Sequence, residues 1–117
     1  MIRVINMSTG AVSTLAGDGS RGLWDGIGTS ASFYDPTDVA MDAAGAVVFV
    51  CDYADFAIRQ INVSSALVTT IAGQTTSGYS DGIGGAAMFR WPQGIGVDAA
   101  GTVALVVRRV VFPLWSA

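Results

Sequence analysis

The 117-residue sequence contains no histidine, no glutamate and no lysine. Its nine acidic residues are therefore all aspartates, and its six basic residues are all arginines. Without histidine, the chain cannot build a Ser-His-Asp or Cys-His catalytic arrangement from its own residues. Glutamate and lysine normally cover helix surfaces, so their absence argues against a mainly helical protein.

Charge and long hydrophobic runs are also scarce. Charged residues make up 13% of the chain, and only Arg108 and Arg109 are adjacent basic residues. We therefore expect no nucleic-acid partner, because nucleic-acid binding needs clustered positive charge. The most apolar segment, residues 102–115, is interrupted by these arginines and by Pro113, so we expect no membrane span. The sequence does not open like a signal peptide, and it predicts no particular compartment.

The single cysteine, Cys51, has no partner for a disulfide within the chain. It lies in the apolar run VVFVC. We interpret it as a small buried hydrophobic residue, in preference to a reactive thiol or a metal ligand.

Hydrophobic residues and glycine are abundant. The chain is 51% hydrophobic and has 15 glycines, with many valines, threonines and isoleucines. This composition predicts short β-strands joined by tight turns, in a chain of a length that suits a single domain. The expected fold class is all-β.

The sequence also repeats itself. Residues 25–45, DGIGTSASFYDPTDVAMDAAG, return 56 positions later at residues 81–101 as DGIGGAAMFRWPQGIGVDAAG, without a gap. Residues 2–17 match residues 58–73 at the same interval. A fixed period of this size indicates structural units that bury their apolar faces against one another. The chain holds roughly two such units.

One unit shows four strand-like segments. They cover residues 37–42, 46–51, 56–62 and 67–72, and short turns separate them, so we predict an antiparallel meander. Asp42 and its counterpart Asp98 precede Ala-Ala-Gly turns, where we expect them to cap the backbone.

The longest connection runs between units and ends at Pro36 or at its counterpart Pro92. We predict a glycine turn, a single helical turn and then a buried aromatic residue, Phe33 in one copy and Phe89 in the other. Because the two phenylalanines are equivalent, each is expected to fill the contact between adjacent units. This structural role is favoured over a ligand contact.

Together these segments resemble the NHL-repeat β-propeller family. The resemblance rests on DVAMDAAGAVVFVCD at residues 38–52, AIRQI at 57–61 and VTTIAG at 68–73. It recurs in GIGVDAAGTVALVV at residues 94–107, in MIRVI at 1–5 and in VSTLAG at 12–17. It covers nearly all of residues 1–107.

The resemblance implies antiparallel four-stranded blades of a six-bladed propeller, incomplete in this chain. Residues 1–17 would end one blade, 37–73 would form a complete blade, and 93–117 would start the next. Six units of this period would need about three times this length, so the chain looks like a fragment. Three copies of two units would also close a six-bladed ring.

The end of the chain departs from the family pattern. Residues 108–117 lack the Ile-Arg-x-Ile signature, and Arg108 replaces the aspartate found at Asp52. We expect an atypical tail there, which leaves the third strand of the last blade open.

No metal and no cofactor is predicted. Asp25 and Asp81 each precede a glycine, but one carboxylate in each loop suits a turn residue better than a cation ligand. The glycine-rich strings have neither the lysine nor the spacing of a phosphate-binding loop.

The candidate binding residues are those that differ between the two copies. The connecting segments exchange Arg21-Gly22-Leu23-Trp24 for Ser77-Gly78-Tyr79-Ser80, and Tyr34-Asp35 for Arg90-Trp91. Positions that vary between copies are expected to be exposed, and Trp, Tyr and Arg are favoured at binding hot spots. We therefore predict a binding surface, with the alternative that some aromatics cover contacts between units. Its members are Arg21, Trp24, Tyr34, Asp35, Tyr79, Arg90 and Trp91.

The favoured functional interpretation is a non-catalytic interaction scaffold that binds an unknown protein, peptide or glycan. The alternative is a truncated piece of a lyase-like or lactonase-like propeller enzyme whose catalytic residues lie in missing blades. A third reading is a truncated product without function. The expected structural partners are the missing blades of a longer chain or further copies of this one.

Overall fold

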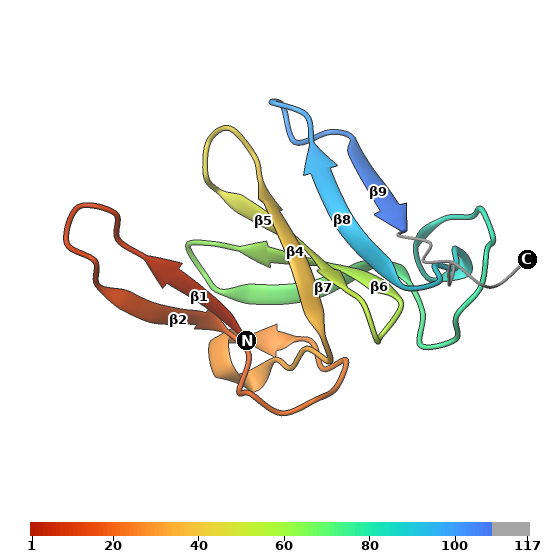
Figure 1. The fold of residues 1–117 in the computed structure, drawn as a ribbon, viewed down its shortest axis with the longest axis horizontal. Coiled ribbons are helices and arrows are strands. Elements are labelled where there is room, and N and C mark those ends of the chain that lie inside the picture. The colour runs from red at the N-terminus through yellow and green to blue at the C-terminus, as the bar shows by residue number, and fades with distance from the viewer. Residues whose placement is uncertain (109–117) are drawn as a thin grey trace, which may run out of the picture.

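The computed structural model describes residues 1–108 and shows three antiparallel sheets (Figure 1). The N-terminal hairpin is formed by β1 (Ile2–Ile5) and β2 (Val12–Ala16), and the C-terminal hairpin by β8 (Pro92–Val97) and β9 (Ala104–Arg108). The central sheet contains β3 (Gly26–Ile27), β4 (Pro36–Met41), β5 (Val47–Asp52), β6 (Ala57–Asn62) and β7 (Leu67–Gly73). Two single-turn 3₁₀ helices, η1 (Gly28–Ser30) and η2 (Gly84–Ala86), lie in the connections. The prediction of an all-β, antiparallel fold is confirmed.

The central sheet has the strand order β3-β7-β6-β5-β4. Strands β4 to β7 form the predicted meander. The short strand β3 was not predicted; it comes from the connection before β4 and pairs Gly26 with Val68 and Ile27 with Leu67. The outer edge of the sheet is therefore covered by a segment that precedes the sheet in sequence.

Aspartate side chains fix two of the hairpin turns. The Asp42 carboxylate accepts hydrogen bonds from the amides of Ala46 and Val47, at 2.8 and 3.2 Å. Asp98 accepts equivalent bonds from Thr102 and Val103, at 2.7 and 3.1 Å. These bonds satisfy backbone donors that the turn leaves without a strand partner. Residues 109–117, which include most of the predicted atypical tail, lie outside the described part of the chain.

Neighbouring units meet through equivalent positions of their first strands. The Thr37 hydroxyl donates to the carbonyl oxygen of Gln93 at 2.9 Å, and these residues are 56 positions apart. The amide of Ile95 donates to the Asp38 carboxylate at 3.0 Å. Strand β8 thus lies beside β4, as Figure 1 shows, and the last unit contacts the central one through their first strands.

The core has two parts, one at each contact between units. The first lies between β2 and the central sheet and includes Ala16, Phe33, Val50 and Ile61. The second lies between the central sheet and the C-terminal hairpin and includes Phe49, Cys51, Ile58 and Ile95. Apolar burial therefore holds the three sheets to one another as well as stabilising each of them.

Phe33 and Phe89 lie at corresponding places in these contacts. A Cβ atom built on Gly17 would meet the Phe33 ring at 3.1 Å, and one built on Gly73 would meet the Phe89 ring at 3.0 Å. Both glycines also have positive φ, 93° and 87°, which other residues rarely adopt. Each phenylalanine thus packs against the end of the last strand of the preceding unit. Phe33 is 3% exposed, whereas Phe89 is only partly buried.

Replacing the two phenylalanines should have unequal effects. We expect Phe33→Ala to reduce the free energy of unfolding by about 3–5 kcal/mol, because it opens a cavity in an enclosed core. Phe89→Ala should cost roughly 1–2 kcal/mol, because its site is already open to solvent. Urea unfolding in dilute solution measures both values. Equal costs would contradict the difference in packing.

Candidate ligand-binding face

The candidate face is built from two connecting segments, residues 17–35 and 74–91, and from the β5–β6 turn at residues 53–56. In Figure 1 residues 17–35 lie at the lower edge and residues 74–91 at the right, while the β4–β5 and β8–β9 turns lie at the upper edge. The position of each segment depends on side chains in the central sheet.

Arg59, in the middle of β6, fixes the first connecting segment. It is fully buried, and its guanidinium donates to the carbonyl oxygens of Ser32 at 2.8 Å and Trp24 at 3.0 Å. It also forms ion pairs with Asp25 at 3.0 Å and Asp52 at 3.3 Å. One side chain therefore joins the third strand to both ends of a loop that precedes it by about thirty residues.

The Phe33 ring completes the surroundings of this guanidinium. The Arg59 Cζ atom lies 4.9 Å from the centre of the ring. The same phenylalanine that fills the contact between units thus stacks against the buried charge. A desolvated cation above an aromatic face is stabilised by the ring quadrupole.

Asp52, at the end of β5, positions the last residues of the segment. Its carboxylate accepts the backbone amides of Tyr34 at 3.1 Å and Asp35 at 2.9 Å. Burial raises the pKa of Asp52, while these hydrogen bonds and Arg59 oppose the rise. The side chains of Tyr34 and Asp35 are consequently left on the outside of a fixed backbone.

Asp55 is a second buried carboxyl group beside this network. Asp55 is 8% exposed, and its Oδ2 atom has no hydrogen-bond partner among the described residues. Burial, together with the negative charge of Asp52, raises the pKa of Asp55 to about 6. This carboxyl therefore changes charge near neutral pH.

Trp91 is the centre of an aromatic and arginine cluster on the second connecting segment. Its ring stacks against Tyr53, with centroids 6.3 Å apart and an interplanar angle of 18°. The Arg90 guanidinium lies 4.8 Å from the Trp91 ring, and that of Arg108 lies 5.8 Å from it. Arg108 also lies 5.2 Å from the ring of Tyr79. Two cations and three aromatic rings therefore meet at one place.

The backbone of Trp91 differs from that of its counterpart. Trp91 has a positive φ of 51°, whereas Asp35 does not have a positive φ. Asp52 accepts the amide of Asp35, but its counterpart, Arg108, carries only donors and cannot accept the amide of Trp91. Left-handed backbone is strained for a bulky residue, and such strain often occurs at binding sites.

A small pocket opens beside this cluster. It has a volume of about 190 Å³. Arg90 and Arg108 supply its charge, and the remaining lining is mainly apolar. The lining residues are Tyr79, Met88, Phe89, Arg90, Pro92, Val106 and Arg108.

The first connecting segment carries a smaller cluster. The Arg21 guanidinium lies 5.6 Å from the Tyr34 ring. Trp24 is 71% exposed. The backbone amide of Tyr53 donates to the carbonyl oxygen of Asp35 at 3.0 Å, which joins the first connecting segment to the turn that carries Tyr53 of the other cluster.

All seven residues proposed from the sequence are exposed in the structure. The contacts bring Arg21 together with Tyr34, and Arg90 with Trp91, while no aromatic or cation contact within residues 1–108 joins Trp24 to either pair. Sequence analysis missed Tyr53 and Arg108. Both also differ from their counterparts one period away: Tyr53 corresponds to Arg109, and Arg108 corresponds to Asp52. The same comparison between copies, extended to the β5–β6 turn, would have found them.

The described residues contain little that is suited to catalysis. Burial raises the pKa of Cys51 to about 12, so its thiol stays protonated, and nearby Asp38 and Asp52 add to the rise. Within residues 1–108, no group of three or more His, Cys, Asp or Glu side chains is arranged to hold a metal ion. No helix in this part of the chain is long and apolar enough to cross a membrane.

The raised pKa of Asp55 predicts a dependence of stability on pH. The folded state holds a proton that the unfolded state releases near pH 3.8, so stability should fall as pH rises from about 4 to about 6. Asp55→Asn should remove this fall and raise the free energy of unfolding at pH 7 by about 1 kcal/mol, after discounting for solvent screening. Urea unfolding at pH 4 and pH 7 measures the effect. Asp35→Asn, at an exposed position whose side chain makes no hydrogen bond within residues 1–108, is the matched control.

No protein-family model and no curated protein matches the chain. Solved structures do match. A structural genomics protein of unknown function from Bacteroides thetaiotaomicron superposes with a TM-score of 0.76 over 89% of this chain, at 20% identity. Two structures described as auxiliary nutrient binding proteins superpose over 82% of it. The one from Bacteroides thetaiotaomicron has a TM-score of 0.64 at 26% identity, and the one from Bacteroides ovatus has 0.65 at 27%.

The chain spans 26% of the length of each of these three proteins. The similarity at 20% identity concerns the fold alone. All three matches extend across more than one of the sheets described above, so the arrangement of neighbouring units is also found in longer proteins.

Proposed function

We propose that this chain is part of an NHL-type β-propeller whose connecting segments form a ligand-binding face. In this proposal residues 1–17 end one blade, 37–73 form a complete blade, and 93–117 begin another. The observation that carries the binding function is the cluster around Trp91. It gathers aromatic and arginine side chains, exposed at Tyr79, Arg90 and Trp91 and half-buried at Tyr53 and Arg108, at positions that differ between the two copies.

The arrangement of the sheets supports the propeller. Adjacent first strands contact each other through positions 56 residues apart, Thr37 and Gln93, as expected when one unit follows another by a constant rotation. The β4–β5 and β8–β9 turns lie together at the upper edge of Figure 1, away from the two long connections. Exposed loops on a rigid scaffold are common places for binding.

The charge of the cluster favours an anionic ligand. Arg90 and Arg108 form no ion pair within the described residues, whereas Arg59 forms two. Their guanidinium groups lie over the same indole, which holds them in place without neutralising them. Guanidinium groups recognise carboxylates, and aromatic rings provide apolar contact area for a sugar or a peptide side chain.

The two nutrient binding proteins from Bacteroides support a binding role over catalysis. They are 26% and 27% identical to this chain. The proposed ligand class is a carboxylate-bearing oligosaccharide or peptide. It agrees with the description of these two proteins and with the positive charge of the face. The alternative, a piece of a propeller enzyme, has no observation of its own to favour it.

Binding by the full chain can be tested with trigalacturonate, the acidic peptide Asp-Phe-Asp and the neutral sugar maltotriose. We expect an anionic probe to bind more tightly than maltotriose. Arg90→Ala and Trp91→Ala should each weaken binding by at least about tenfold, in the range of hot-spot losses. Isothermal titration calorimetry measures the affinities.

Arg3→Ala, on the N-terminal hairpin, is the charge-matched control, and it should leave the affinity unchanged when the chain is dilute enough to be monomeric. Equal affinities of the unmodified chain and both face variants would overturn the proposed face. Binding of maltotriose alone, or of no probe, would overturn the anionic ligand class.

A further inference from the structure

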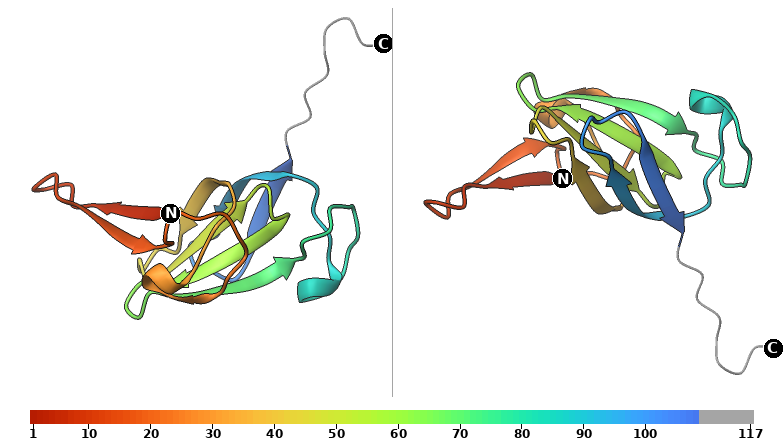
Figure 2. Two further views of the ribbon diagram at one scale, coloured as in Figure 1. Left: turned by 90° about the horizontal axis from the view of Figure 1, so that it is seen from below. Right: turned by 90° about the horizontal axis from the view of Figure 1, so that it is seen from above.

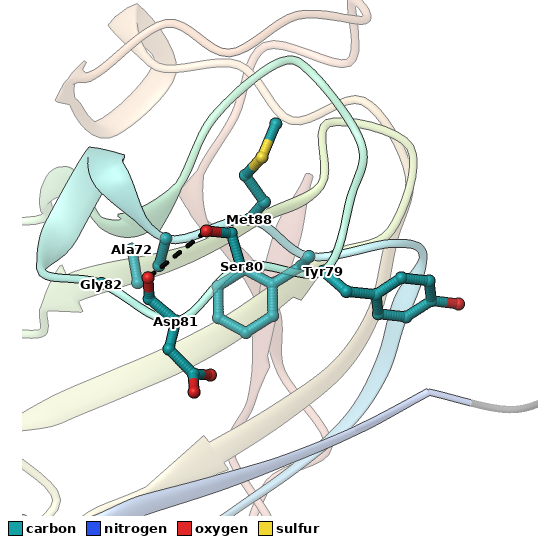
Figure 3. Close-up of a pocket in the computed structure, with 8 residues that line it drawn as sticks. Ala72, Tyr79, Ser80, Asp81, Gly82 and Met88 are labelled. Atoms are coloured by element: carbon teal, nitrogen blue, oxygen red, sulfur yellow. Dashed lines mark hydrogen bonds between the residues drawn. The ribbon is translucent and has the colours of Figure 1, made fainter.

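An open pocket, which we call the Asp81 pocket, lies at the outer end of the second connecting segment. It has a volume of about 670 Å³ (Figure 3). No hydrogen bond or ion pair within residues 1–108 reaches the Asp81 carboxylate that lines it. The lining residues are Ala72, Tyr79, Ser80, Asp81, Gly82, Ala87, Met88 and Phe89.

The lining repeats the surroundings of Arg59. Four of the five residues that contact the Arg59 guanidinium lie in the first connecting segment: Trp24, Asp25, Ser32 and Phe33. One period further along the chain they become Ser80, Asp81, Met88 and Phe89. All four counterparts line the Asp81 pocket.

The backbone of the two segments also corresponds. The amide of Ser32 donates to Trp24 at 3.0 Å, and the amide of Met88 donates to Ser80 at 2.9 Å. The pocket is therefore the place that Arg59 fills in the preceding unit, with the backbone already arranged around it.

The arginine that would fill this place must come from the third strand of the next unit. One period after Arg59 the sequence has Trp115, so the chain supplies no guanidinium there. One period before Arg59 it has Arg3, which lies on β1 and is exposed. Arg3 is the remaining arginine at a third-strand position of the repeat.

We propose that the Asp81 pocket binds Arg3 of a second copy of this chain. Strand β9 of one copy then pairs with β1 of the next, so that the C-terminal and N-terminal hairpins complete one four-stranded sheet. The pairing of β5 with β6 gives the register, because Val50 lies opposite Arg59 and Phe49 opposite Gln60. The corresponding pairs join Val106 to Arg3 of the second copy and Leu105 to Val4 of the second copy.

Exposed apolar side chains on both hairpins support this pairing. Leu105 is 74% exposed, whereas its counterpart Phe49 is 8% exposed. Ile5 is 57% exposed, whereas its counterpart Ile61 is fully buried. Figure 2 shows the N-terminal hairpin projecting away from the other sheets, with contact only near its base. Among residues 1–108 the outer edges of β1 and β9 have no strand partner, and apolar edges of this kind favour pairing with another chain.

Charge determines how strong the contact is. Arg3 of the second copy would reach the carbonyl oxygens of Ser80 and Met88 and the carboxylate of Asp81. It would lack the ion pair that Asp52 supplies to Arg59, because Arg108 stands at that position. The Arg108 guanidinium lies over Tyr79 and Trp91, but its positive charge still opposes a second arginine.

The association is head to tail, since each copy offers one hairpin of each kind. Such an interface forms a closed ring when the rotation between units allows it, and an open chain otherwise. Three copies would close a ring of six units.

The first test measures association by analytical ultracentrifugation of the full chain over a range of concentrations. We expect reversible oligomers. Arg3→Ala and Asp81→Asn should each raise the dissociation constant about tenfold or more, and Arg108→Asp should lower it by about tenfold. Arg21→Ala and Asp18→Asn are charge-matched controls outside the contact and should leave the dissociation constant unchanged.

A monomer at every concentration, including for Arg108→Asp, would overturn the proposal. Oligomers that Arg3→Ala and Asp81→Asn leave unaffected would also overturn it.

The second test checks the register. Directly opposed residues in an antiparallel pair have Cα atoms about 4.5–5.5 Å apart, within the range of a disulfide. Val4→Cys combined with Leu105→Cys should give covalent oligomers on mild oxidation, while Val4→Cys with Val103→Cys, two residues away, should give far fewer. Native Cys51 is buried and should not interfere. Equal cross-linking of both pairs would overturn the register. The Arg3, Asp81 and cysteine variants leave Arg90, Trp91 and Arg108 unchanged, so a failure of association in them is distinguishable from a failure of ligand binding. Arg108→Asp alters both sites and is used for association alone.

Discussion

The structure depends on a single buried guanidinium. Arg59 has no exposed surface, yet it carries a full charge and contacts two carboxylates and two carbonyl oxygens. Burying a charge without partners costs several kcal/mol, so the loop that supplies the partners must stay in place once the sheet forms. The connecting segment is therefore held in place by its hydrogen bonds and ion pair with Arg59 as well as by apolar packing. Phe33 links the two effects, since it lies in the core and also stacks on the guanidinium.

Because the sequence repeats, the same pattern occurs in this chain once with neighbouring strands on both sides and once with only some of them. Arg59 has neighbouring strands on both sides and is buried, while Arg3, at the equivalent place, is exposed on a two-stranded hairpin. Phe33 is enclosed, and Phe89 is only partly buried beside the Asp81 pocket. Burial in this chain thus follows from neighbours more than from residue type. This is the behaviour expected of repeat proteins, in which each unit is stabilised by the next.

Much of the fold could be predicted from the sequence because its determinants are local and periodic. Strand segments, aspartate-capped turns and the constant interval between copies are all visible in the sequence itself. Strand β3 was not predictable in this way, because Gly26 and Ile27 have no strand pattern and pair with residues some forty positions later. Asp25 was interpreted as a turn residue for the same reason. Its ion pair with Arg59 and the hydrogen bond it accepts from the Thr70 hydroxyl appear only once the chain has folded back on itself.

The candidate site shows a further limit of sequence reasoning, and position 108 explains it. In the complete unit Asp52 accepts two backbone amides and one arginine, so it fixes the connecting segment. Arg108 at the equivalent place can do neither, because a guanidinium has no acceptor atom. The amide of Trp91 loses this acceptor, its backbone turns to positive φ, and its indole stacks on Tyr53 beneath two arginines. The exchange of aspartate for arginine at position 108 thus removes a hydrogen bond that fixes the connecting segment. It also adds a positive charge to the face around Trp91. The binding residues would then lie where the repeat lacks one of its stabilising interactions.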